Sequence, residues 1–159
     1  MNNYKTILAL DLGTVTGWAL QNKNNNIISG TENFKTNSFE GGGMVFLRFK
    51  KWLVDLKNSE GGFDEIYFEQ VRSHKGVEAA HKYGGFLAHL TAFCEHHQIA
   101  YKGVPVGTIK KHITGKGNAT KYAVIDAVKS KGFSPKDDNE ADSLALLHCV
   151  LAKYNRGEL

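Results

Sequence analysis

The chain has 159 residues, of which 42% are hydrophobic and 23% charged, and its formal net charge is +4. This length suits one domain with its own core, and no apolar run approaches the roughly 20 residues that cross a bilayer. The start of the chain leads directly into a predicted strand and lacks the layout of a signal peptide. Because the only two cysteines, Cys94 and Cys149, lie far apart in predicted helices, we expect no disulfide. We therefore predict a cytoplasmic protein that does not associate with membranes.

The first part of the chain predicts the beginning of a sheet. An apolar run that starts at residue 7 ends in Asp11 and then turns at Gly13, as expected for a buried strand. Two more short strands are predicted at residues 16–20 and 27–31, with an Asn-rich link between them. Because short turns join all three strands, we expect them to pair in antiparallel fashion.

The middle of the chain alternates between helix and strand. Apolar residues at helical spacing predict an amphipathic helix over 44–56, and the apolar segment 66–69 then predicts a strand parallel to the first one. A second helix is expected over 77–95, followed by a strand over 99–104 and a short helix over 108–113.

The last part of the chain is predicted to be helical. A basic loop at residues 114–119 leads into a helix over 120–131, and a final helix is expected over 140–154 with Asp138 or Asn139 as its N-cap. The complete order predicts an α/β fold, in which a mixed sheet of three antiparallel strands followed by parallel strands is flanked by helices.

Three acidic residues stand at the ends of these elements: Asp11 and Glu69 end two strands, and Asp142 lies near the start of the last helix. Strand ends on one side of an α/β sheet face the same crevice, so the three side chains can converge. Carboxylates about 4 Å apart repel by roughly 4 kcal/mol at an effective dielectric near 20, so such a cluster calls for cations. Oxygen ligands suit Mg²⁺, with Mn²⁺ as a substitute, and two such ions support phosphodiester hydrolysis. Simpler interpretations stay open, with Asp11 as a turn cap and Asp142 as an acid that favours the helix dipole.

Positive charge is concentrated in one segment of the chain. Residues 101–136 contain eight lysines and a single acidic residue, Asp126. This concentration favours a polyanion such as nucleic acid as the partner, and the alternative is a solvated lysine-rich face.

Three of these segments, 9–14, 68–71 and 140–145, together resemble the RuvC family of Holliday-junction resolvases, in particular its short bacterial and phage-type members. The resemblance implies an RNase H-like fold, with residues 1–159 as a single nuclease domain. It also implies a homodimer that uses Mg²⁺ to cut four-way DNA junctions by paired nicks. By the same resemblance, Asp11, Glu69 and Asp142 are the catalytic acids and metal ligands.

The chain departs from the family pattern at two positions. The family's fourth acid commonly stands three residues before the last one, where this chain has Asn139. The fourth ligand is therefore Asp138, Glu140 or the amide oxygen of Asn139. Well-studied members also place an aromatic wedge three residues after the glutamate, where this chain has Arg72.

The resemblance also places the DNA contacts. The basic loop 114–119 lies where the family has its junction-contacting loop. We expect phosphate contacts from the residues around that loop and from the segment that follows Glu69, namely Lys110, Lys111, Lys116, Lys121, Arg72, His74 and Lys75.

Two other functions remain open from the sequence, a YqgF-like RNase H-fold nuclease that acts on RNA and a catalytically inactive module that binds branched DNA. For the dimer, the helix over 77–95 is the candidate interface. Gly84 and Gly85 would permit close approach there, with Phe86 and Leu87 beside them. The rival expectation is that these glycines pack against the protein's own sheet.

Overall fold

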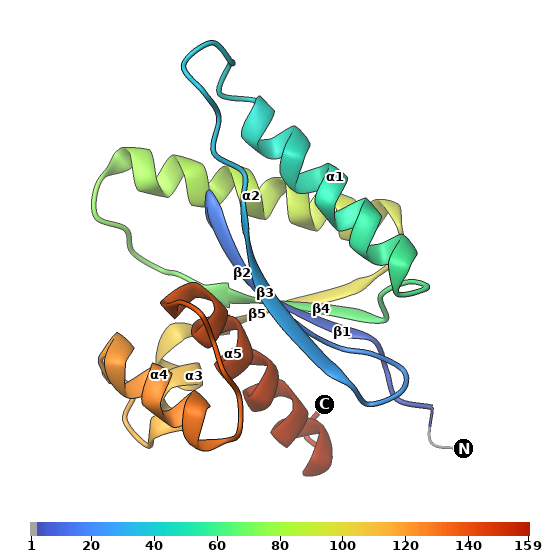
Figure 1. Ribbon diagram of the computed structural model, residues 1–159, viewed down its shortest axis with the longest axis vertical. Helices are drawn as coiled ribbons and strands as arrows, with labels where there is room; N and C mark the ends of the chain where they lie inside the picture. The colour runs from blue at the N-terminus through green and yellow to red at the C-terminus, as the bar shows by residue number, and fades with distance from the viewer. Residues whose placement is uncertain (1–2) are drawn as a thin grey trace.

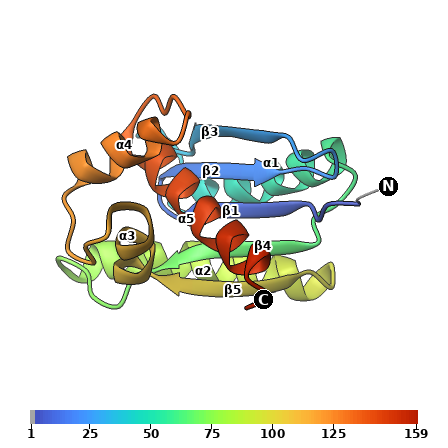
Figure 2. The same ribbon diagram turned by 90° about the horizontal axis from the view of Figure 1, so that it is seen from below.

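The computed structural model describes residues 3–159. Its sheet has five strands in the order β3-β2-β1-β4-β5 (Figure 2). In chain order the elements are β1 Ile7–Asp11, β2 Val15–Gln21, β3 Ile27–Asn33, α1 Met44–Ser59, β4 Glu65–Gln70, α2 Val77–His96, β5 Ala100–Pro105, α3 Val106–Thr114, α4 Lys121–Ser130 and α5 Asp138–Asn155.

The strand pairing confirms the predicted mixed sheet. β1 pairs in antiparallel fashion with β2, and β2 does so with β3, whereas β1–β4 and β4–β5 are parallel pairs. The parallel pairs place the C-terminal ends of β1 and β4 side by side, at the end of the sheet where α5 begins (Figure 2).

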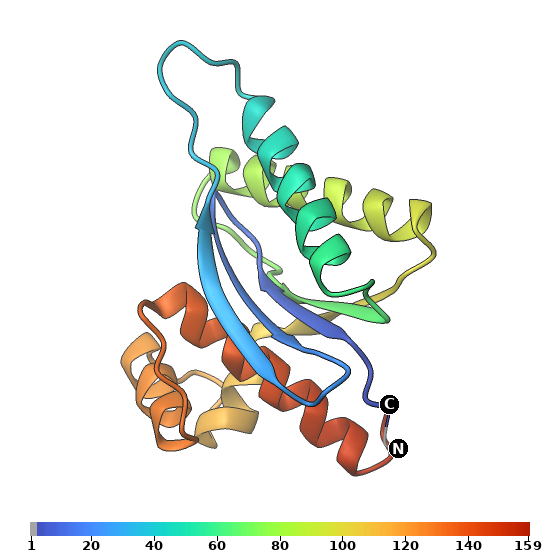
Figure 3. The same ribbon diagram turned by 45° about the vertical axis from the view of Figure 1, so that its right-hand side comes forward.

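Helices cover both faces of the sheet. α1 and α2 lie on one face, and α3, α4 and α5 lie on the other (Figures 1 and 3). β1 is buried on both faces: Leu8 and Leu10 belong to the core under α1 and α2, whereas Ile7 and Ala9 belong to the core under α5. This burial explains why β1 is an uninterrupted apolar run in the sequence.

The start of α5 differs from the prediction. Its N-cap is Asp137, whose carboxylate accepts a hydrogen bond from the backbone N–H of Glu140 at 2.8 Å, so the prediction of Asp138 or Asn139 was wrong. Three successive residues here have the capping chemistry, and Asp137 is the one that stands three residues before a glutamate. Asp142 consequently lies in the second turn of α5, beyond the first turn where an acid mainly favours the helix dipole.

The glycines of α2 also differ from the prediction. A Cβ at Gly85 would lie 2.4 Å from the Phe46 ring of α1, and Phe86 is fully buried in the core. The close approach at Gly85 is therefore made by the chain's own α1 rather than by a second subunit or the sheet. A Cβ at Gly84, in contrast, would meet open space.

Both cysteines are buried and free, as expected, and burial raises the pKa of the Cys94 thiol to about 12. Within residues 3–159, none of the helices has the length and apolarity needed to cross a membrane.

Candidate metal centre

Three carboxylates meet where β1, β4 and α5 come together. Asp11 is the last residue of β1, Glu69 is near the end of β4, and Asp142 projects from α5. One ligand oxygen from each residue lies within 4.8 Å of the others. The register of the parallel pair, with Leu10 opposite Phe68, brings Asp11 and Glu69 to the same level of the sheet. This is the convergence that the sequence predicted.

The turn after Asp11 is closed by another residue. The Thr16 hydroxyl donates a hydrogen bond to the Gly13 carbonyl at 2.7 Å and accepts one from the Gly13 N–H at 3.3 Å. Because Thr16 performs the closure, the turn does not depend on the Asp11 side chain, and that carboxylate faces the other two acids.

The carboxylates oppose one another electrostatically. Burial raises the pKa of Asp11 well above its ordinary value, and the charges of Glu69 and Asp142 raise it further. Burial also raises the pKa of Asp142 to about 7, with the charges of Glu69 and Asp138 adding to the effect, while Lys110 opposes it. A partly buried group of hard oxygen ligands with excess negative charge fits Mg²⁺ or Mn²⁺.

The other acids at the start of α5 point in different directions. Asp138 precedes Asp142 by one helical turn, and its charge raises the pKa of both Asp11 and Asp142. Glu140 instead accepts hydrogen bonds from the Ser29 hydroxyl at 2.8 Å and the Lys136 N–H at 2.9 Å. Glu140 is therefore engaged by β3 and the Lys136 backbone, whereas Asp138 lies one helical turn before Asp142.

One supporting contact was not predicted. The Tyr83 hydroxyl of α2 donates to the Glu69 carbonyl at 2.8 Å and accepts from the Val71 N–H at 3.3 Å. This contact fixes the backbone at the end of β4. No spacing or charge pattern in the sequence pointed to Tyr83.

The residues expected to contact DNA fall into two groups around the carboxylates. Arg72 and Lys75 are exposed in the loop between β4 and α2, and the His74 ring packs on Tyr83 with 4.9 Å between ring centroids. This loop follows Glu69 directly.

The second group lies on α3, the following loop and the start of α4. Lys110 is half-buried and near enough to Asp142 to influence its pKa. Lys111, Lys116 and Lys121 are exposed. The loop is held by Thr114, whose hydroxyl donates to the Lys110 carbonyl at 2.7 Å and accepts from the Lys116 N–H at 3.1 Å.

The mixed five-stranded sheet with helices on both faces is the α/β arrangement that the sequence predicted. Neither a protein-family model nor a curated protein sequence matches this chain. Solved structures do match it. RuvC of Thermus thermophilus in complex with a Holliday-junction substrate superimposes with a TM-score of 0.80 at 18% identity, with 98% of each chain covered.

Two further structures agree with this result. Another structure of Thermus thermophilus RuvC gives a TM-score of 0.76 at 18% identity, covering 96% of this chain and 97% of that one. The yeast mitochondrial Holliday-junction resolvase Ydc2 gives 0.64 at 13% identity, covering 96% and 81%. The predicted RNase H-like fold is thus confirmed as the fold of RuvC.

Proposed function

We propose that this chain is a metal-dependent endonuclease that resolves four-way DNA junctions by paired nicks, with residues 1–159 acting as one nuclease domain. The convergence of Asp11, Glu69 and Asp142 within 4.8 Å, on a RuvC fold, carries the proposal. The two free, buried cysteines fit action in the cytoplasm.

The mechanism follows from what the side chains can hold. Asp11, Glu69 and Asp142 would bind the ions, and Asp138, one helical turn before Asp142, is our candidate for the fourth ligand. Two bound Mg²⁺ ions would supply an activated water and stabilise the leaving oxygen of a phosphodiester. Lys110 would place a positive charge between the acids and an approaching phosphate.

DNA binding would use basic side chains from two segments of the chain. Arg72, His74 and Lys75 follow Glu69 in the loop after β4, and Lys111, Lys116 and Lys121 lie on α3, the following loop and the start of α4. Such contacts position the duplex without reading its sequence. Because Arg72 stands where well-studied relatives have an aromatic wedge, this chain would hold an open junction through phosphate contacts.

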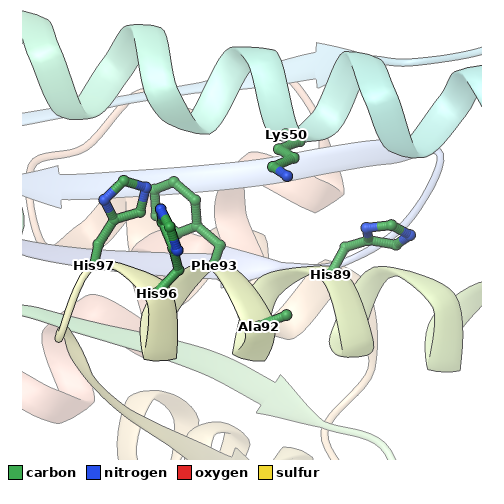
Figure 4. A pocket seen from close by; sticks show the side chains of 6 residues that line it. All are labelled: Lys50, His89, Ala92, Phe93, His96 and His97. Atoms are coloured by element: carbon green, nitrogen blue, oxygen red, sulfur yellow. The ribbon is translucent and has the colours of Figure 1, made fainter.

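Paired nicks require two active sites related by a two-fold axis, so we propose a homodimer. The outer face of α1 and α2 is the candidate interface. Leu47 is 59% exposed there, and a groove of about 370 Å³ lies between the two helices, lined by Lys50, His89, Ala92, Phe93, His96 and His97 (Figure 4).

The acids provide the first test of this function. Asp11→Asn, Glu69→Gln and Asp142→Asn should each lower Mg²⁺-dependent cleavage of a four-way junction by at least about a thousandfold, because each removes a metal ligand. Junction affinity measured without metal should stay near the wild-type value. Near-normal cleavage by any one variant would remove that residue from the site.

The substrate panel separates the remaining functions. Four-way junctions, flaps, duplex DNA and RNA should be compared at the same Mg²⁺ concentration. Glu78→Gln, which changes an exposed acid on α2, is the matched control for the three acid substitutions and should cleave like the wild type. Preference for RNA would favour the YqgF-like function. Tight junction binding with no cleavage under Mg²⁺ or Mn²⁺ would indicate an inactive module.

A further inference from the structure

The first turn of α5 is held by two hydroxyl groups on one face of β3. Ser29 donates to Oε1 of Glu140 at 2.8 Å, and Thr31 donates to the two carboxylate oxygens of Asp137 at 3.0 and 2.9 Å. The two donors are two residues apart on the strand, so they share a face of the sheet. They join β3 to residues that are more than 100 positions later in the chain.

The acidic residues at the start of α5 therefore fall into two groups. Asp137 and Glu140 both accept hydrogen bonds from β3, and Glu140 is only 6% exposed with both of its oxygens bonded. Asp142 instead meets Asp11 and Glu69, and Asp138 lies four residues before it on the same helical face. Neither Ser29 nor Thr31 has another hydrogen-bond partner within residues 3–159 that would explain its side chain.

The sheet beneath this turn is in register with the metal centre. Gly17 of β2 pairs with Asp11 on one side and with Thr31 on the other. A Cβ at Gly17 would lie 1.9 Å from the Asn139 carbonyl oxygen, so the backbone of α5 rests directly on β2. Asp11, Gly17 and Thr31 thus form one row across the sheet. Asp11 belongs to the carboxylate cluster, Gly17 lets the backbone of α5 approach the sheet, and Thr31 bonds to the N-cap Asp137.

We propose that Ser29 and Thr31 are positioning residues of the metal centre. By tying Asp137 and Glu140 to β3, they set the distance from Asp142 and Asp138 to Asp11 across the sheet. This inference rests on the proposed function because it concerns the same ions. It assigns the two hydroxyls a role in metal affinity, beyond a role in fold stability.

The test measures metal binding directly. Isothermal titration calorimetry with Mn²⁺, without DNA, should compare the wild type with Ser29→Ala, Thr31→Val and the double variant. Residues that orient metal ligands typically contribute 10–100-fold in affinity, so we expect the double variant to bind Mn²⁺ at least about tenfold more weakly. Each single variant should lie between the two, and these decide the question if the double variant does not fold.

Two matched variants separate positioning from stability. Thr31→Ser keeps the hydroxyl and should recover most of the affinity that Thr31→Val loses. Ser59→Ala removes a comparable hydroxyl bond, to the Leu56 carbonyl at 2.9 Å at the end of α1, and should leave Mn²⁺ affinity unchanged. Melting temperatures in EDTA should be recorded for all variants.

The outcomes are distinguishable. Wild-type Mn²⁺ affinity in the β3 variants, with only a lower melting temperature, overturns the positioning role and leaves the proposed function intact. A wild type that binds no Mn²⁺ overturns the metal centre and this inference with it. Weakened binding in Thr31→Val that Thr31→Ser restores supports the inference.

Discussion

At the start of α5, the role of each acid depends on the direction in which the helix points it. Residues 137–142 contain four acids, of which the sequence predicted Asp142 as a metal ligand and left Asp138 and Glu140 as alternatives for a fourth one. Asp142 meets Asp11 and Glu69 at the strand ends, Asp138 lies one helical turn before it, and Asp137 and Glu140 bond to β3. The fourth ligand can therefore be tested one residue at a time.

Substitutions of Asp138 and Asn139 should have different effects on the Mg²⁺ requirement for cleavage. If Asp138 is the fourth ligand, Asp138→Asn should raise the Mg²⁺ concentration for half-maximal cleavage by roughly tenfold or more. Asn139→Ala should change it little, since Asp137 provides the helix cap and only the Asn139 backbone meets Gly17. A Mg²⁺ titration of cleavage measures both variants, and the reverse pattern would identify the Asn139 amide as the ligand.

The raised pKa of Asp142 predicts how stability depends on pH. A carboxyl group with a higher pKa in the folded protein binds its proton more tightly when folded. The free energy of unfolding therefore falls as pH rises from 3.8, the ordinary value, to about 7. The metal-free protein should melt several degrees lower at pH 8 than at pH 5, and Mg²⁺ should restore most of the difference at pH 8.

Asp142→Asn is the matched control for this effect. The amide cannot ionise, so its melting temperature in EDTA should fall less between pH 5 and pH 8 than that of the wild type. Parallel curves for the two proteins would show that Asp142 titrates as an ordinary solvated acid.

The sequence predicted the cluster of three carboxylates better than the hydrogen bonds that support it. Asp11, Glu69 and Asp142 could be found because each ends or begins an apolar element, and the parallel pairing of β1 with β4 brings two of them together. Tyr83 and Thr31 could not be found, because their roles consist of hydrogen bonds between elements that are distant in sequence. Periodicity along the chain carries no information about such contacts.

At the scale of elements, every predicted strand and helix is present, and the deviations are at their ends. β1 and β4 were recognisable because both faces of the sheet are covered, which makes their apolar runs continuous. The start of α5 was misplaced because three neighbouring residues can all cap a helix, and the choice among them depends on Glu140 and on contacts with β3.

The lysine-rich segment at residues 101–136 is the part of the chain that should bind the phosphate backbone. Lys110, Lys111, Lys116 and Lys121 should each release counterions on binding, so each Lys→Ala change should flatten the dependence of log K on log salt by about 0.9. Affinity should fall equally for junctions of different sequence, because phosphate contacts do not read bases. Fluorescence anisotropy at several salt concentrations gives the slope.

Lys23→Ala is the control for this series. Lys23 is exposed in the hairpin between β2 and β3, at the opposite end of the sheet from the carboxylates (Figure 2). Its removal should leave the slope unchanged. If all four changes behave like Lys23→Ala, the segment is a solvated face rather than a DNA-binding surface.

At the scale of the whole molecule, the sheet separates two helical surfaces to which the proposed function assigns different roles. α3, α4 and α5 lie on the side that carries the basic loop, and α1 and α2 form the opposite layer (Figure 1). The C-terminal ends of β1 and β4 lie between these layers, so in the proposed function DNA would reach the carboxylates without contacting the outer face of α1 and α2. A dimer formed through that face would leave both proposed active sites accessible.

Two adjacent glycines on α2, Gly84 and Gly85, allow the proposed dimer interface to be tested separately from the packing of α2 on α1. Gly85 faces the Phe46 ring, so Gly85→Leu should lower the melting temperature by disturbing the core between α1 and α2. Gly84 faces open space, so Gly84→Leu should keep the fold and act only where a second subunit approaches. With a dimer across this face, Gly84→Leu should give a folded monomer by light scattering that nicks junctions singly. A Gly84→Leu protein that stays dimeric would place the interface elsewhere, and a wild type that is monomeric even with junction bound would exclude the dimer.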